Sequence, residues 1–120
     1  MSGVILSVDD SALMRRMVKA TLESSGHEVV EAADGRQALA LASAYRLDVV
    51  VADLHMPAMD GLALTKCLRQ MPGYRLAPIL LLTSESNARR KQLGRACGVT
   101  DWIIKPFDPR AFLAVVARLL

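Results

Sequence analysis

The chain has 120 residues, of which 52% are hydrophobic and 22% are charged. This composition is close to that of ordinary globular proteins, and the length predicts one domain over residues 1–120. Disordered and collagen-like classes are excluded, and no apolar run is long enough to cross a membrane. A net charge of +3 is too small to predict direct binding of nucleic acid.

The first residues and the cysteines bear on the cellular compartment. The N-terminal sequence has no basic segment ahead of an apolar stretch, so no secretory signal is recognised. Cys67 and Cys97 lack metal-ligand spacing and are expected to be free thiols, as in a reducing compartment. These features predict a cytoplasmic protein without membrane insertion.

The first third of the chain has the pattern of a strand, a helix and a second strand. Residues 4–8 predict a buried strand, and Ser11 stands where it would cap a following helix. Gly26 would end that helix, with His27 in a surface turn, and residues 28–32 predict a weaker, edge-type strand. The apolar residues expected on one face of this helix are Leu13, Met14, Met17, Val18 and Leu22.

The rest of the chain repeats this alternation. Asp34 can cap a second helix, with Gln37 at the capping-box position. Asp108 can cap the last helix, which has Pro109 in its first turn. The remaining strands are predicted at residues 47–52, 77–82 and 102–104, with helices through residues 62–68 and about 87–97 between them.

Strands that alternate with helices predict an α/β fold, in which a parallel sheet has helices on both faces. Ligands of such folds bind at the carboxyl ends of the strands. Polar residues follow four of the five predicted strands, so all of them belong to this edge. They are Asp9, Asp10, Asp53, Thr83 and Lys105.

These side chains form a chemically coherent set. If the first and third strands are neighbours, Asp9, Asp10 and Asp53 converge, and three carboxylates repel unless a cation lies among them. Mg²⁺ fits, because it takes oxygen ligands and keeps waters that a phosphate can replace. Lys105 and Thr83 would add a cation and a hydroxyl, as phosphoryl transfer onto an aspartate requires. Taken singly, the residues are equally consistent with helix caps, an ion pair and a strand end.

Four stretches carry a family resemblance that extends over the whole chain. On these motifs the sequence resembles a bacterial response-regulator receiver domain of two-component signalling, most closely the stand-alone, CheY-like chemotaxis type. The resemblance implies a flavodoxin-like, doubly wound sheet of five parallel strands in the order 2-1-3-4-5. The stretches are Val8-Asp9-Asp10-Ser11, Asp53-Leu54-His55-Met56-Pro57-Ala58-Met59-Asp60-Gly61, Leu82-Thr83-Ser84-Glu85 and Ile104-Lys105-Pro106-Phe107.

The resemblance implies a phosphoacceptor and a metal site. Asp53 would accept the phosphoryl group and ligate Mg²⁺ together with Asp10, with Asp9 acting through water. The backbone carbonyl of His55 would be a further ligand. The His55 side chain, two residues after the acceptor, would face the phosphoryl group and give it an atypical lifetime.

The resemblance also implies a switch. Thr83 and Lys105 would contact phosphoryl oxygens, and the bond between Lys105 and Pro106 is expected to be cis. Trp102 stands at a position that is usually Tyr or Phe in the family. The indole would turn inward as Thr83 moves, or it would serve only to pack the fifth strand.

Partners follow from the same resemblance. A histidine kinase or small phosphodonor would supply the phosphoryl group, and the fourth helix, fifth strand and last helix would bind a downstream protein. The protein would be a monomer or a weak, phosphorylation-dependent homodimer, with chemotaxis as one expected pathway. Basic residues on the fourth helix form either a solvated face or a docking site for an acidic partner. They are Arg89, Arg90, Lys91 and Arg95.

Other functions remain as alternatives. A phosphatase of the haloacid-dehalogenase type would need an Asp where this sequence has His55, and neither Gly-rich nucleotide motif occurs. A phosphorylation-independent interaction module is a further alternative, although such receivers typically lose an acid or the lysine and none is missing here. A fragment of a longer regulator with an output domain is the third. The receiver interpretation treats the domain as a signalling protein that catalyses its own phosphorylation and dephosphorylation, and not as a metabolic enzyme.

Overall fold

The computed structural model describes residues 3–84 and 88–120, with the side chains of residues 88–90 outside the description. Over these residues the chain forms a parallel sheet of five strands and five helices, in the order β2-β1-β3-β4-β5. The predicted fold class and strand order are therefore confirmed. The strands are β1 (Val4–Val8), β2 (Glu28–Ala32), β3 (Val49–Asp53), β4 (Ile79–Thr83) and β5 (Asp101–Ile104). The helices are α1 (Ala12–Glu23), α2 (Gly35–Ala44), α3 (Gly61–Arg69), α4 (Ala88–Cys97) and α5 (Pro109–Leu119).

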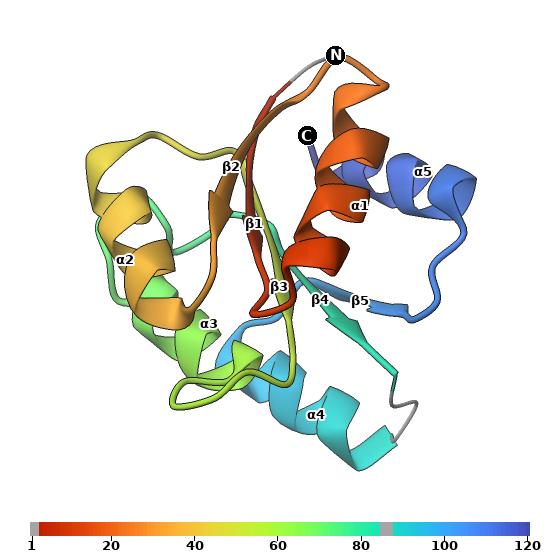
Figure 1. Ribbon diagram of the computed structural model, residues 1–120. Helices are drawn as coiled ribbons and strands as arrows, with labels where there is room; N and C mark the ends of the chain where they lie inside the picture. The colour runs from red at the N-terminus through yellow and green to blue at the C-terminus, as the bar shows by residue number, and fades with distance from the viewer. Residues whose placement is uncertain (1–2, 85–87) are drawn as a thin grey trace.

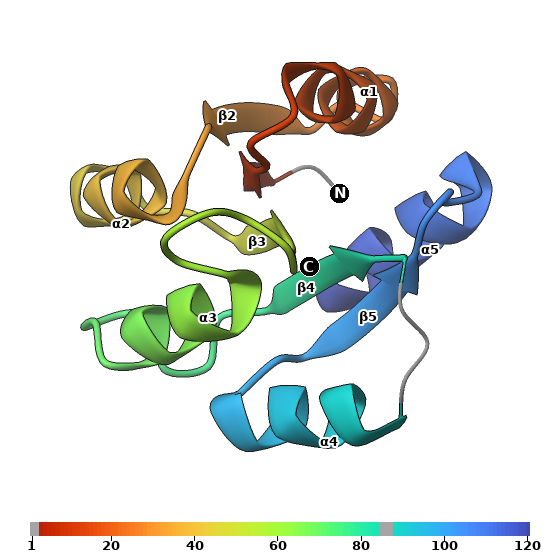
Figure 2. The same cartoon turned by 60° about the horizontal axis from the view of Figure 1, so that its bottom comes forward.

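The sheet separates two layers of helices. Figures 1 and 2 show α1 and α5 on one face, and α2, α3 and α4 on the other. After β2 the chain crosses back over β1 to form β3, so the strand order reverses between β1 and β3. In open α/β sheets the carboxyl ends of the strands at such a reversal are where ligands bind.

The core lies on both faces of the sheet. Every residue of β3 and β4 is buried, because each of these strands has a neighbour on both sides and helices above and below. Val51 packs in the cluster under α1 and α5, whereas Val50 packs in the cluster under the other three helices. Such burial on both faces explains the continuous apolar runs in the sequence.

The predicted helix starts are confirmed. Ser11, Asp34 and Asp108 each accept a hydrogen bond from a backbone N–H in the first turn of the helix that follows. Asp60 does the same for α3, accepting from the N–H of Ala63 at 2.8 Å. These caps satisfy donors that a helix leaves unpaired, and they place each helix directly after its loop.

Two expectations about single residues are wrong. His27 is not at the surface: it is 6% exposed, and its Nδ1 accepts a hydrogen bond from the N–H of Gly3 at 3.2 Å. On α1, Leu13 and Met17 are exposed, whereas Val18 is buried. At 3.6 residues per turn, Leu13 and Met17 lie roughly 100–140° around the helix from Val18, which turns them away from the sheet.

Some element boundaries differ from those predicted. The third and fourth strands begin two residues later and extend one residue further, so that Asp53 and Thr83 belong to the strands themselves. The predicted start of the fourth helix, Asn87, lies outside the described residues. Within residues 3–84 and 88–120, none of the helices has the length and hydropathy needed to cross a membrane.

Candidate functional site

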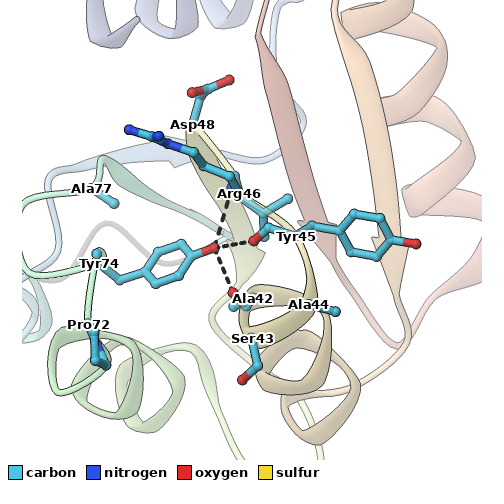
Figure 3. Close-up of a pocket in the computed structure, with 11 residues that line it drawn as sticks. Ala42, Ser43, Ala44, Tyr45, Arg46, Asp48, Pro72, Tyr74 and Ala77 are labelled. Atoms are coloured by element: carbon cyan, nitrogen blue, oxygen red, sulfur yellow. Dashed lines mark hydrogen bonds between the residues drawn. The ribbon is translucent and has the colours of Figure 1, made fainter.

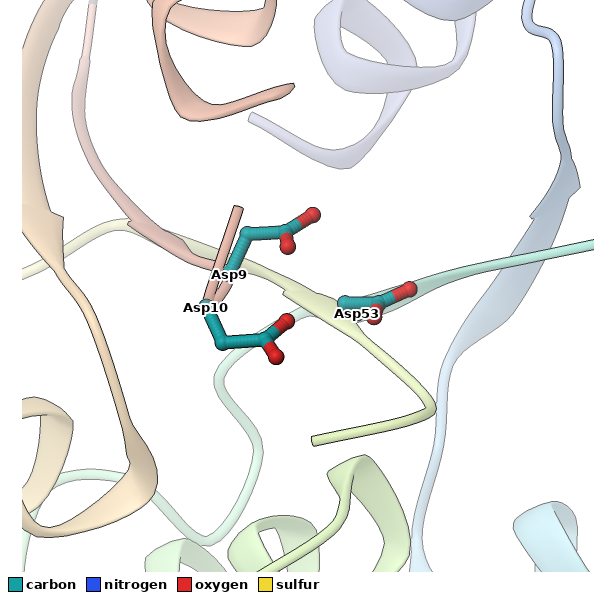
Figure 4. Close-up of side chains that lie close together, drawn as sticks. All are labelled: Asp9, Asp10 and Asp53. Atoms are coloured by element: carbon teal, nitrogen blue, oxygen red, sulfur yellow. The ribbon is translucent and has the colours of Figure 1, made fainter. Parts of the chain in front are cut away.

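Three carboxylates meet at the carboxyl edge of the sheet, at the reversal of strand order. Parallel pairing sets Val8 opposite Ala52, so the next residues of the two strands, Asp9 and Asp53, come together. Oxygen atoms of Asp9, Asp10 and Asp53 all lie within 4.8 Å of one another. In Figure 4 the side chains of Asp9 and Asp10 extend toward Asp53, which lies at the end of the neighbouring strand β3. The predicted convergence of these acids is therefore found in the structure.

Lys105 closes one side of this acid cluster. Its Nζ lies 2.6 Å from Oδ1 of Asp53 and 3.9 Å from Oδ2 of Asp9. The N–H of Lys105 donates to the carbonyl of Thr83, which fixes the start of the loop after β5, and the bond to Pro106 is cis as expected. A single ammonium group leaves three clustered carboxylates with a net negative charge.

Asp9 is the acid least accommodated by the protein. It is 3% exposed, and its Oδ1 accepts from the N–H of Ser11 at 2.9 Å. Its Oδ2 is buried and receives no hydrogen bond from the described residues. Burial raises the pKa of Asp9, the nearby charge of Asp53 raises it further, and the bond from Ser11 opposes both effects.

The cluster is suited to a hard divalent cation. The ligand atoms are carboxylate oxygens, one of them buried and without a hydrogen bond, while Asp10 is exposed and leaves the site open to water. A hydrated cation among them would satisfy the free oxygen atom through a bound water and offset the repulsion between the acids. The donor set therefore fits Mg²⁺.

We expect Asp9→Asn to stabilise the protein at neutral pH in the absence of divalent cations. Because the pKa of Asp9 is raised on folding, the free energy of unfolding falls as the pH rises from the ordinary value of 3.8 through the raised pKa. The neutral amide avoids this loss, and the gain should be on the order of 1 kcal/mol. Urea unfolding at pH 7 and pH 4 in EDTA measures it. A variant that is less stable than the parent at pH 7 would contradict the electrostatic explanation.

Thr83 and His55 lie at the same edge. Thr83 is 1% exposed, and by strand alternation its side chain shares a face of the sheet with Leu81. Leu81 pairs with Trp102, so Thr83 and Trp102 lie on one face. His55 is exposed in the loop after β3. Each residue predicted for the site is thus at the carboxyl edge or beside it.

Comparison with known proteins agrees with this geometry. The family model described as response regulator receiver domain matches residues 5–117. The chain belongs to the response regulator receiver domain family. Its structure superposes on the chemotaxis response regulator CheY4 of Vibrio cholerae with a TM-score of 0.96, at 44% identity and with both chains fully covered.

Two curated relatives are longer than this chain. The chain is 38% identical to the alkaline phosphatase synthesis transcriptional regulatory protein PhoP of Bacillus subtilis, and 36% identical to the transcriptional regulatory protein SrrA of Staphylococcus aureus. It is fully covered in both matches but spans about half the length of these curated relatives, 49% and 48%.

The receiver domain of the histidine kinase PA1611 of Pseudomonas aeruginosa holds a magnesium ion in its active-site cleft. That domain has 28% identity, a TM-score of 0.90 and coverage of 99% and 98%.

Trp102, the aromatic residue at the expected switch position, packs against Gly94 of α4. A Cβ atom added at Gly94 would overlap the indole ring, so the absence of a side chain there makes room for it. The indole Nε1 is buried and has no hydrogen-bond partner among the described residues. The sequence analysis did not single out Gly94. A glycine within a helical segment signals a close approach, but not the residue that approaches.

We expect Gly94→Ala to destabilise the domain, although alanine favours a helix by about 1 kcal/mol over glycine. The added methyl group must displace the Trp102 ring or α4, at a cost of about 1–3 kcal/mol. Thermal unfolding should show a lower midpoint, and Trp102 emission should shift to longer wavelength as the ring becomes more exposed. Gln92→Ala, at an exposed position of α4, is the control. A more stable Gly94→Ala variant with unchanged emission would contradict this packing.

A separate hollow lies at the opposite end of the sheet. It has a volume of about 530 Å³ and lies between the C-terminal end of α2 and the loop after α3 (Figure 3). The Tyr74 hydroxyl lies 2.8 Å from the carbonyl oxygens of both Ala42 and Tyr45, and it accepts from the N–H of Leu47 at 3.4 Å. Tyr74 thus ties the two segments together, and none of the clustered acids lines this hollow.

Proposed function

We propose that this receiver domain is a phosphorylation-activated switch whose phosphoacceptor is Asp53. The observation that carries the proposal is the pairing of Asp53 with Lys105 beside two further carboxylates at the reversal of strand order. A buried carboxylate with a cation on one side and room for a metal ion on the other is suited to attack phosphorus. Asp53 is 6% exposed, so most of its surface is shielded from bulk water.

The metal ligands proposed are Asp10 and Asp53 directly, Asp9 through water, and the backbone carbonyl of His55. When bound, Mg²⁺ supplies positive charge that neutralises the phosphoryl oxygens. Asp10 is exposed and Asp53 is buried, so one proposed ligand is open to solvent and the other is shielded from it.

The reaction moves a phosphoryl group from a phosphohistidine of a partner kinase, or from a small donor, to a carboxylate oxygen of Asp53. The P–N or P–O bond of the donor breaks as the new P–O bond forms, and Lys105 follows the charge to a phosphoryl oxygen. The Thr83 hydroxyl donates to another phosphoryl oxygen. Water attack on phosphorus breaks the P–O bond to Asp53, releases inorganic phosphate and returns the free carboxylate, which resets the switch. The exposed His55 beside the acceptor would influence that water.

The output surface proposed is formed by α4, β5 and α5. Lys91, Arg95 and Asp101 border a hollow of about 300 Å³ beside Trp102. The two cations outnumber the one carboxylate, which favours an acidic partner. Phosphorylation would draw Thr83 toward Asp53 and alter the packing of Trp102 on the same face of the sheet. Arg89 and Arg90 were also predicted for this surface, but their side chains lie outside the described residues.

The cellular setting is proposed from the relatives. We propose a cytoplasmic protein that neither inserts into membranes nor binds nucleic acid directly. It would be a monomer or a weak, phosphorylation-dependent homodimer. Chemotaxis is the pathway suggested by CheY4, which the chain matches over its full length. The second candidate is the receiver part of a longer regulator, which PhoP and SrrA favour because the chain spans about half of each.

Intact-mass measurement after incubation with acetyl phosphate tests the proposal. We expect the mass of one phosphoryl group to be gained with Mg²⁺ and not with EDTA, because without the metal the incoming phosphate meets a net negative cluster. A chain that gains no phosphoryl group under either condition would instead support a phosphorylation-independent interaction module.

A further inference from the structure

Arg15, in the first turn of α1, reaches back to the loop that carries two of the acids. Its Nη1 donates a hydrogen bond to the backbone carbonyl of Asp9. Its Nε lies 3.6 Å from Oε1 of Glu31 on β2, and the Nζ of Lys19 lies 3.6 Å from the other oxygen of Glu31. The Arg15 side chain is 18% exposed, which is low for a guanidinium group near a helix start.

The carbonyl that Arg15 holds belongs to the peptide between Asp9 and Asp10. On its N-terminal side this segment is fixed by the sheet, because the N–H of Asp9 donates to the carbonyl of Ala32 at 3.2 Å. On its C-terminal side the N–H of Ser11 bonds the Asp9 carboxylate. A planar peptide has no internal rotation, so fixing its carbonyl also fixes the N–Cα bond of Asp10, from which the Asp10 side chain starts.

The charge of Arg15 is directed away from the acid cluster. An arginine so close to three carboxylates would ordinarily pair with one of them in bidentate fashion. Here the guanidinium contacts a carbonyl and Glu31, and Lys105 is the one described cation within 4.0 Å of a clustered carboxylate. Because Arg15 pairs with Glu31, it stays in place without occupying a carboxylate oxygen of the acid cluster that a metal ion needs.

We infer that Arg15 is a positioning residue for the divalent cation. It holds the Asp9–Asp10 peptide so that the Asp10 carboxylate faces Asp53, and Glu31 orients it from β2. The inference rests on the proposed function, since it concerns the same metal site, but it assigns a role to residues outside the set of ligands.

Electrostatics and positioning predict opposite signs for the loss of this side chain. If Arg15 acts only through its charge, Arg15→Met removes a cation near the cluster and strengthens binding of a divalent ion. If Arg15 positions the loop, the same variant weakens binding, because Asp10 no longer has a fixed direction. Arg16 is the next residue on the helix and is exposed, so Arg16→Met makes the same change of charge without the contact.

The test is the dissociation constant for Mn²⁺, an oxygen-seeking ion that can be counted free in solution by electron paramagnetic resonance, with Mg²⁺ as competitor. We expect Arg15→Met to bind Mn²⁺ about 3- to 10-fold more weakly, whereas Arg16→Met should bind as tightly as the parent or slightly more tightly. The affinity of Arg15→Lys should lie between those of the parent and Arg15→Met, because an ammonium group can contact the Asp9 carbonyl or Glu31 but not both at once as the guanidinium does. Circular dichroism at the same temperature verifies that each variant is folded. If Arg15→Met is not folded, Arg15→Lys takes its place in the test.

Two results would overturn the inference, and they can be told apart. If the parent binds Mn²⁺ and Asp10→Asn does not, while folded Arg15→Met binds like the parent or more tightly, the metal site is upheld and the role of Arg15 is wrong. If the parent fails to bind Mn²⁺, or Asp10→Asn binds it equally well, the proposed metal site and the inference are both wrong.

Discussion

Asp53→Asn should abolish phosphorylation by acetyl phosphate, lowering the rate by at least a hundredfold. The amide is close to the carboxylate in size, but its oxygen carries no negative charge and forms no stable bond to phosphorus. It also leaves Lys105 without the partner that lies 2.6 Å away. Intact-mass kinetics with Mg²⁺ present measures the loss.

The control for Asp53→Asn changes the charge elsewhere. Glu28→Gln, at an exposed position of β2, removes one negative charge and should phosphorylate at the rate of the parent. Since Asp53 lies beside Asp9, loss of its charge should also ease the repulsion in the cluster and leave the fold intact. A variant that folds and still gains one phosphoryl group would show that another residue is the acceptor.

Arg69→Met should destabilise the domain by about 2–4 kcal/mol. The guanidinium of Arg69 donates to the carbonyl oxygens of Tyr74, Ala77 and Gly98 at 2.6–3.1 Å, and no carboxylate among the described residues lies within 4.0 Å of it. The side chain is partly buried, and this burial lowers the pKa of Arg69. Methionine replaces the apolar stem of the side chain but not the guanidinium, so three carbonyl oxygens would lose their donor. Urea unfolding at pH 7 gives the difference.

The matched change is Arg118→Met on α5. Arg118 pairs with Asp101 at 3.3 Å, but its side chain is 69% exposed. Solvent-exposed ion pairs contribute about 0–1 kcal/mol, so this variant should unfold close to the parent. Equal effects of the two substitutions would show that the carbonyl contacts of Arg69 do not hold the ends of α3 and α4 together.

The sequence predicted those features that depend on local patterns. Apolar runs and helical periods gave the alternation of strands and helices, and Ser11 and Asp108 were recognised as caps because their side chains bond their own backbone neighbours. The convergence of acids followed from strand ends meeting at one edge. The strand order did not follow from the residues themselves, and it came from the family resemblance.

Features that depend on remote backbone groups were not predicted. Arg15 and Arg69 look like ordinary helix-surface cations in the sequence, because the carbonyl groups they bind carry no side-chain signal. His27 appeared to be a turn residue, yet its ring is buried by an N-terminal segment that lies next to it only in the folded chain. In each case the partner lies in another loop or strand, and residue type alone does not identify it.

Borohydride trapping of the phosphorylated protein tests the central claim most directly. Borohydride reduces an acyl phosphate to an alcohol, which converts a phosphorylated aspartate into homoserine, and peptide mass mapping then locates it. We predict a single homoserine at position 53, formed only when both acetyl phosphate and Mg²⁺ were present. Homoserine at position 9 or 10, or a phosphoryl group that resists borohydride and remains on Thr83 or His55, would contradict the account.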